Sequence, residues 1–236
     1  MRLHLTARNL SLAVLALALV ILSGAIVYKW YMNQKNFYTA GAPPKELLQR
    51  VEPKKVPYDS IKPPAVQGGE TFLIGSVTSS YYGVIFFGDY TDGSSAKAFK
   101  DTELAVAAYH GKIRLIWRQL PASTDDGSVS FEAAVLSECS RIVNLTWSAH
   151  KALLDASSAG ITKSKLDGIT DNLDPSGMLA LCREDATMRK TIRQTIARYR
   201  GDGIDTAPFV FVGTRAFPST KATPQALTQA IRDLVK

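Results

Sequence analysis

The sequence predicts an α/β fold from the order of its elements along the chain. A strand, a helix and a second strand follow one another between residues 83 and 121. A long helical block comes next, and the C-terminus has the pattern of two short strands and a helix. Strands that alternate with helices indicate a sheet with parallel strands. The chain has 236 residues, of which 46% are hydrophobic, so it is long and apolar enough for one packed domain plus an appendage.

Three strands and one helix are expected to make up the first half of the fold. Residues 72–77, FLIGSV, and 83–90, GVIFFGDY, have the pattern of strands, and the second is apolar enough to be buried on both faces. Residues 95–110 have helical spacing and end before Gly111, a residue type that often follows a helix. Residues 112–121, KIRLIWRQLP, form the next predicted strand. This order makes a βαβ unit, whose crossover is right-handed in nearly all proteins.

The second half combines helices with a hairpin. Apolar residues recur at helical spacing over 131–155 and again over 177–200, after a break at Asp174-Pro175. Residues 207–218, APFVFVGTRAFP, have the pattern of two short strands that turn at Gly213-Thr214. A final helix is predicted over 224–235, with Thr223 as its N-cap and Pro224 at its first position.

The N-terminus carries an apolar run without a charge from Leu10 to Tyr28. About 20 such residues span the bilayer core as a helix, and Trp30 and Tyr31 suit the membrane interface. We therefore expect residues 1–31 to be a transmembrane anchor that contacts the membrane through residues 10–31. A cleaved signal peptide is the alternative, because Ser23-Gly24-Ala25 offers the small residues that a signal peptidase needs.

Residues 32–70 are rich in proline and lysine and contain few long apolar side chains. This composition predicts an extended, semi-stiff tether. The net charge of +7 is spread along the chain, and no helix-turn-helix or zinc-binding pattern accompanies it. A nucleic-acid partner is therefore not expected. The lysines and arginines on the two sides of the apolar run do not favour an orientation with the C-terminal domain outside, and lean against it.

Four local sequences, in this order and spacing, resemble the DsbA-like branch of the thioredoxin superfamily. The first two are FFGDYTDGSSAKAF at 86–99 and GKIRLIWRQLP at 111–121. The third, AAVLSECSRIVNLTWSAHKALL at 133–154, has Trp147, His150 and Leu153 at the family's aromatic, histidine and leucine positions. The fourth is GIDTAPFVFVGTRAF at 203–217.

The resemblance covers residues 71–236 and implies a thioredoxin-like fold with a central mixed sheet. It also implies a helical subdomain inserted at about residues 125–200. Proteins of this family work outside the cytoplasm, so the resemblance places the domain on the periplasmic side of a bacterial-type membrane. The chain would then be a single-pass membrane protein.

The family's two redox cysteines are missing from this sequence. In the family a Cys-x-x-Cys motif sits at a helix N-terminus, where the unpaired N–H groups lower the thiol pKa. Aligned backwards from Phe99, the cysteine positions become Gly93 and Ala96; aligned forwards from Asp89-Tyr90, they become Asp92 and Ser95. Neither alignment contains a cysteine, so we expect no catalytic residue, metal or cofactor at this turn.

The polar residues of the turn have a structural explanation. Asp92, Ser94 and Ser95 are good N-cap residues and can satisfy the free N–H groups of a helix. A hydrolytic serine would need a base nearby, and the candidates are His110 and His150. His110 lies at the far end of the predicted helix, and His150 is expected to be a packing residue, so serine hydrolysis is disfavoured.

The only cysteines are Cys139 and Cys182, both in predicted helices. Similar family members carry cysteines at matching positions, in some cases bonded to one another, so the resemblance implies a structural disulfide. Its loop of about 44 residues would be worth about 4 kcal/mol by the chain-entropy model. Two separate buried thiols are the alternative.

Pro208 falls at the family's cis-proline, where the preceding backbone pairs with an extended substrate chain. The resemblance therefore implies a polypeptide-binding loop at Thr206, Ala207, Pro208 and Phe209, facing the turn at 92–96. Ala207 departs from the Thr or Val that is more usual in the family, but backbone pairing needs no particular side chain.

Three functions follow as hypotheses. The first is a redox-inactive domain that binds polypeptide in the folding or assembly of envelope proteins. The second is a structural or interaction subunit of an envelope complex, whose groove is unused. The third is a thiol-disulfide oxidoreductase, as the family implies, working through Cys139 or Cys182.

Overall fold

The computed structural model describes residues 58–65, 74, 83–109 and 112–235. The predicted anchor or signal peptide at 1–31 lies outside these residues, as do most of the tether, His110, Gly111 and, apart from Ile74, the strand predicted at 72–77. Among the described residues, no helix is both long enough and apolar enough to cross a bilayer.

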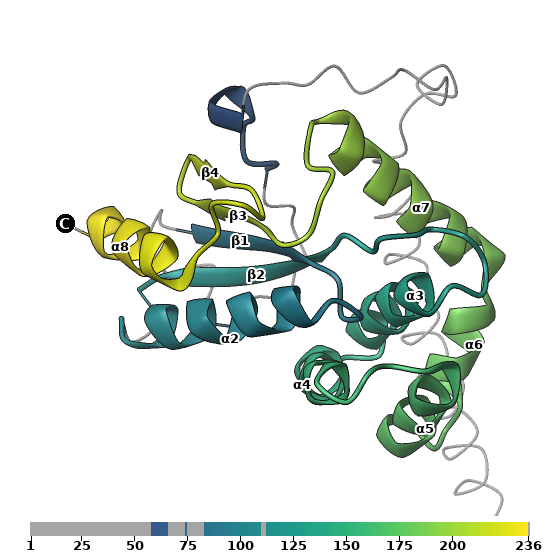
Figure 1. Cartoon of the computed structure of the whole chain (residues 1–236). Helices are drawn as coiled ribbons and strands as arrows, with labels where there is room; N and C mark the ends of the chain where they lie inside the picture. The colour runs from purple at the N-terminus through teal and green to yellow at the C-terminus, as the bar shows by residue number, and fades with distance from the viewer. Residues whose placement is uncertain (1–57, 66–73, 75–82, 110–111, 236) are drawn as a thin grey trace, which may run out of the picture. The chain divides into compact units, whose positions relative to one another are not determined.

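The core is a four-stranded mixed sheet in the order β2-β1-β3-β4 (Figure 1). β1 (Gly83–Gly88) pairs in parallel with β2 (Arg114–Gln119) and antiparallel with β3 (Phe209–Val212), which pairs antiparallel with β4 (Arg215–Phe217). Ile74 forms an isolated antiparallel bridge with Leu115 on the other side of β2. α2 (Gly93–Ala107) connects the parallel pair, as the βαβ prediction requires.

Successive side chains of a strand point to opposite faces of the sheet, and different elements cover the two faces. Phe86 packs edge-on against Phe99 of α2, and α2 in turn packs against α8 (Pro224–Leu234). Its neighbour Phe87 points to the opposite face, where its ring meets Tyr199 of α7 at 5.0 Å. The sheet is thus buried on both faces, which explains the continuous apolar run of β1.

Part of the predicted tether packs against the domain. Ile61 is only 5% exposed and belongs to the hydrophobic core, and the Ala65 carbonyl accepts a hydrogen bond from Arg118. The ring of Tyr58, in a short 3-10 helix (Tyr58–Ser60), contacts that of Phe209. The packed domain therefore includes residues 58–65, earlier than the composition of this segment indicates.

The helical insertion lies between β2 and β3 and contains more helices than the sequence pattern predicts. Both predicted helices divide in two, and a further helix at Lys163–Leu173 occupies a stretch for which no helix is predicted. The first predicted helix divides at Asn144, whose φ of 61° ends one helix before the next begins. The second divides at Asp185, whose carboxylate accepts hydrogen bonds from the N–H groups of Thr187 and Met188. The inserted helices are α3 (Val129–Ile142), α4 (Thr146–Ser157), α5 (Lys163–Leu173), α6 (Met178–Glu184) and α7 (Ala186–Gly201).

Candidate functional site

The candidate site is the N-terminal tip of α2, where the resemblance places the redox motif. Asp92 is the N-cap of this helix, and its carboxylate accepts hydrogen bonds from the N–H groups of Ser94 at 3.0 Å and Ser95 at 2.9 Å. The hydroxyls of the same two serines also donate to it, at 2.6 and 2.7 Å. One carboxylate therefore gathers four donors at the tip of the helix.

These contacts keep Asp92 ionised at neutral pH. Partial burial raises the pKa of its carboxyl, but the hydrogen bonds from Ser94 and Ser95 outweigh this effect and hold the pKa below its ordinary value. The negative charge lies at the positive end of the helix dipole, which stabilises it further. The position that would stabilise a thiolate in a redox protein thus holds a permanent carboxylate.

The residues at the two possible positions of the missing cysteine pair differ in burial and contacts. Asp92 is partly exposed, Ser95 is fully buried, and the two side chains are in direct hydrogen-bond contact. Gly93 and Ala96 have the same three-residue spacing but carry no polar side chain, so the contact at Asp92–Ser95 does not decide between the two alignments.

A buried carboxylate, for which the sequence predicts no contacts, supports this turn. Asp89 is 3% exposed, and its Oδ1 accepts hydrogen bonds from the N–H and hydroxyl of Thr91. Its Oδ2 accepts from the N–H of Ala122 at 2.8 Å and the hydroxyl of Ser130 at 2.6 Å. Asp89 therefore joins the end of β1 to the loop after β2 and to the start of α3.

A chain of buried polar side chains links the sheet to the insertion. Trp117 Nε1 donates to Gln119 Oε1, and Gln119 Nε2 donates to the hydroxyl of Ser137 at 2.7 Å. That hydroxyl lies 3.1 Å from the Tyr90 hydroxyl, which lies 2.7 Å from His150 Nδ1. Ser137 therefore accepts from Gln119 and also contacts Tyr90, which completes the connection to His150 of the insertion.

His150 is consequently a neutral packing residue. Burial lowers its pKa to about 3, and burial likewise raises the pKa of Tyr90. Its Nδ1 is hydrogen-bonded to Tyr90, and its Nε2 has no hydrogen-bond partner among the described residues. The hydroxyls of Ser94 and Ser95 donate to Asp92 instead, so this histidine does not activate them.

The loop before β3 contains the expected cis peptide bond, between Ala207 and Pro208. Phe209 pairs with Phe87, so one further step of the register brings Pro208 alongside Gly88, just before the turn that leads into α2. Thr206 is exposed and Ala207 is half-buried, whereas Pro208 and Phe209 are buried. Within the described part of the chain, Ala207 makes no backbone–backbone hydrogen bond.

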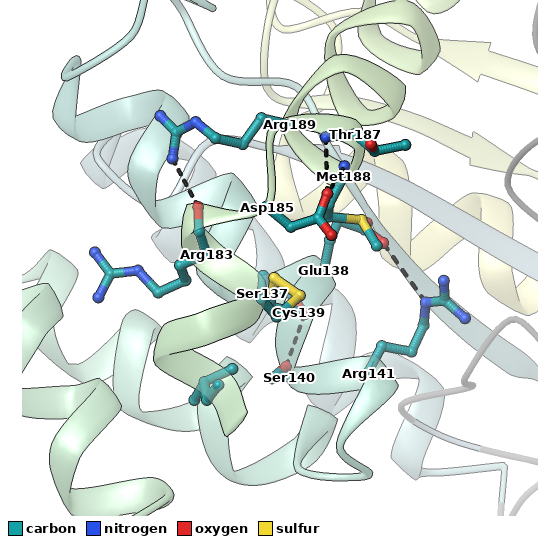
Figure 2. The surroundings of a disulfide bond; sticks show 12 residues. Ser137, Glu138, Cys139, Ser140, Arg141, Arg183, Asp185, Thr187, Met188 and Arg189 are labelled. Atoms are coloured by element: carbon teal, nitrogen blue, oxygen red, sulfur yellow. Dashed lines mark hydrogen bonds and ion pairs between the residues drawn. A yellow bond between two sulfur atoms is a disulfide. The ribbon is translucent and has the colours of Figure 1, made fainter. Parts of the chain in front are cut away.

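Cys139 and Cys182 form a disulfide between α3 and α6, with their Cα atoms 5.7 Å apart (Figure 2). An ionic cluster lies nearby: Glu132 of α3 contacts Arg183 at the end of α6 and Arg189 of α7. Burial raises the pKa of Glu132, but the hydrogen bond and charge of Arg189 outweigh it and lower that pKa overall. These contacts fasten the inserted helices to one another.

Comparisons with known proteins agree with this architecture. No family model and no curated protein sequence matches the chain. Among solved structures, the thiol-disulfide exchange protein alpha-DsbA2 from Wolbachia pipientis is 21% identical over 68% of this chain and 85% of its own, with a TM-score of 0.55. A thioredoxin-like oxidoreductase from Silicibacter pomeroyi is 20% identical over 71% and 92%, with a TM-score of 0.59.

A third similar structure is a periplasmic thioredoxin-like protein from Salmonella enterica serovar Typhimurium. It is 20% identical over 69% of this chain and 89% of its own, with a TM-score of 0.55. These similarities show that the chain has a thioredoxin-like α/β fold of the kind seen in DsbA-like thiol-disulfide oxidoreductases, which confirms that part of the fold prediction.

Proposed function

We propose that the domain binds extended polypeptide without exchanging disulfides, as part of the folding or assembly of envelope proteins. The observation that carries the proposal is the Asp92–Ser95 contact, at the helix tip where the resemblance would put a redox pair, together with the cis-proline loop beside β1. Disulfide exchange requires attack by a thiolate, and neither a carboxylate nor a serine hydroxyl can replace it.

The peptide would pair with the backbone of the loop at 206–209. An extended chain adds to a free edge through main-chain hydrogen bonds, and the side chains around that edge set the preference. The N–H and C=O of Ala207 are the groups available for such pairing, because they have no backbone partner among the described residues. Ser94 and Thr206 are exposed and would flank the bound chain.

The proposal includes an extracytoplasmic location with the chain anchored through residues 10–31. Its support is the apolar run at Leu10–Tyr28, together with the similarity of the domain to a periplasmic protein of the same fold. This part is tested with a cysteine introduced at Thr228, on the exposed surface of α8. The cysteine should react with a membrane-impermeant maleimide in intact cells. Protection from the reagent until the cells are lysed would contradict it.

Two assays test the binding role and the absence of exchange. A photo-crosslinking residue at Ser94 should capture unfolded polypeptide, whereas the same residue at Thr228 of α8 should not. Ala207→Asp should reduce capture at Ser94 without lowering the melting temperature. Equal capture at both positions, or none at Ser94, would favour a role as a structural subunit.

The purified protein should not reduce or oxidise a peptide disulfide catalytically. Turnover that is lost on replacing Cys139 or Cys182 by serine would instead establish a thiol-disulfide oxidoreductase and overturn the proposal. The two assays are independent, so a failure of one is not confused with a failure of the other.

A further inference from the structure

The disulfide of this protein requires an oxidant from outside the chain. Cys139 and Cys182 are its only cysteines, and they are bonded to each other. Joining two thiols releases two protons and two electrons, and no other thiol or disulfide in the chain can accept them. Because only one pairing exists, the reaction needs an oxidant but no isomerase.

The two cysteine residues differ in exposure. Cys139 is 0% exposed within α3 and belongs to the hydrophobic core, whereas Cys182 is partly exposed and packs against the edge of that core. Its helix, α6, lies at the surface, as the 49% exposure of Met178 and the 70% exposure of Leu181 show. Cys182 is therefore the more accessible of the two cysteines while the insertion is folded.

We propose that the disulfide is installed by an external disulfide that enters at Cys182 and is resolved by Cys139. The Cys182 thiolate attacks the external disulfide, forming a mixed disulfide and releasing one external thiolate. The Cys139 thiolate then attacks Cys182 Sγ, which forms the internal bond and releases the second external thiolate. The protein loses two protons and two electrons, and the external disulfide becomes two thiols.

This inference does not rest on the proposed peptide binding. It assigns the protein as a substrate of disulfide-forming chemistry, with Cys182 as the entry cysteine and Cys139 as the resolving cysteine. The external disulfide can belong to a small molecule such as oxidised glutathione or to the active site of a protein dithiol oxidase. The chemistry at Cys182 is the same for both.

A matched pair of single variants tests the order of attack. After reduction, folded Cys139→Ser should accumulate a mixed disulfide with oxidised glutathione at Cys182, detected by intact-mass spectrometry. Folded Cys182→Ser should react at least about tenfold more slowly, because its remaining thiol, Cys139, is buried. In denaturant the two variants should react at similar rates. Equal native rates, or a faster Cys182→Ser, would overturn the assignment.

A measurement on the unsubstituted chain covers the case in which a variant misfolds. Reduced wild-type protein treated with limiting maleimide should be labelled first at Cys182, as shown by peptide mapping. Labelling first at Cys139, or at neither cysteine without denaturant, would refute the entry route.

Repeating the Cys139→Ser reaction with a dithiol oxidase in its disulfide form separates the two sources of the external disulfide. A faster reaction than with glutathione at equal concentration indicates a protein oxidant, and a slower one a small disulfide.

Discussion

Asp92 illustrates how a single residue type decides what a helix N-terminus can do. The free N–H groups at this position stabilise any anion, whether a thiolate or a carboxylate. A thiolate remains a nucleophile there, whereas the carboxylate of Asp92 only caps the helix, through Ser94 and Ser95. The local fold is therefore compatible with both chemistries, and the side chain selects between them.

Returning cysteines to the turn tests the alignment of the missing pair. Asp92→Cys with Ser95→Cys should form a disulfide under air and confer measurable reduction of an insulin disulfide, because those two side chains already touch. Gly93→Cys with Ala96→Cys is the comparison pair, since it represents the other alignment with the same spacing. Greater activity in the comparison pair would show that the other alignment is correct.

His150 makes the stability of the domain depend on pH. Its pKa is about 3 in the folded protein against an ordinary 6.5, so between these values the unfolded chain binds a proton that the folded one does not. This contribution is complete above about pH 6.5 and is lost as the pH falls towards 3, with a slope of at most about 1.4 kcal/mol per pH unit.

Urea unfolding of wild type and His150→Gln between pH 7 and pH 4 measures this contribution. Glutamine can still accept from Tyr90 but does not titrate, so the variant should be less stable at pH 7 and show a shallower decline. All other titrating groups are common to both proteins. Parallel pH profiles would show that the histidine is protonated equally in both states.

At the scale of elements, the end of β1 depends on a glycine. A Cβ at Gly88 would lie 2.2 Å from Trp117 Cη2, whose ring is stacked between Phe86 and Tyr90. Gly88→Ala should therefore destabilise the domain by about 1–3 kcal/mol through overpacking. Gly83→Ala, at the other end of the same strand, meets nothing within 4 Å and should change the free energy of unfolding by less than about 1 kcal/mol. Similar losses in both variants would contradict this explanation.

The elements also show what a sequence can and cannot predict. The hydrophobic pattern identified β1, β2, α2, the β3–β4 hairpin and α8, because the helices bury one regular face and the central strands are apolar on both faces. It did not reveal the breaks at Asn144 and Asp185, where the apolar spacing continues across the junction and only the backbone conformation or a capping side chain interrupts the helix. The cap at Asp92 was predictable, because its hydrogen bonds join residues two and three apart.

At the scale of the whole domain, long-range pairs were out of reach of the sequence. Tyr90 and His150 are 60 residues apart, and nothing in either local sequence indicates the bond between their side chains. The same holds for Asp89 with Ser130 and for Glu132 with Arg189. These polar contacts, together with the disulfide, connect the insertion to the sheet and its own helices to one another.

Ile61 tests whether residues 58–65 belong to the folding unit. Removing its buried side chain in Ile61→Ala should lower the free energy of unfolding by about 2–4 kcal/mol, in one cooperative transition with the rest of the domain. Lys62→Ala, next to it and exposed, should have little effect. A loss below about 0.5 kcal/mol for Ile61→Ala would mean that the segment only rests on the surface.

If polypeptide binds at this turn, as proposed, the Asp92–Ser95 contact has a consequence for its release. A cysteine pair changes its oxidation state when it reacts with a partner, and a second protein must restore that state before the pair can react again. A carboxylate held by hydroxyls has one chemical state, which the binding and release of a partner leave unchanged. Occupancy of such a surface follows partner concentration and affinity alone, and release requires no reductant.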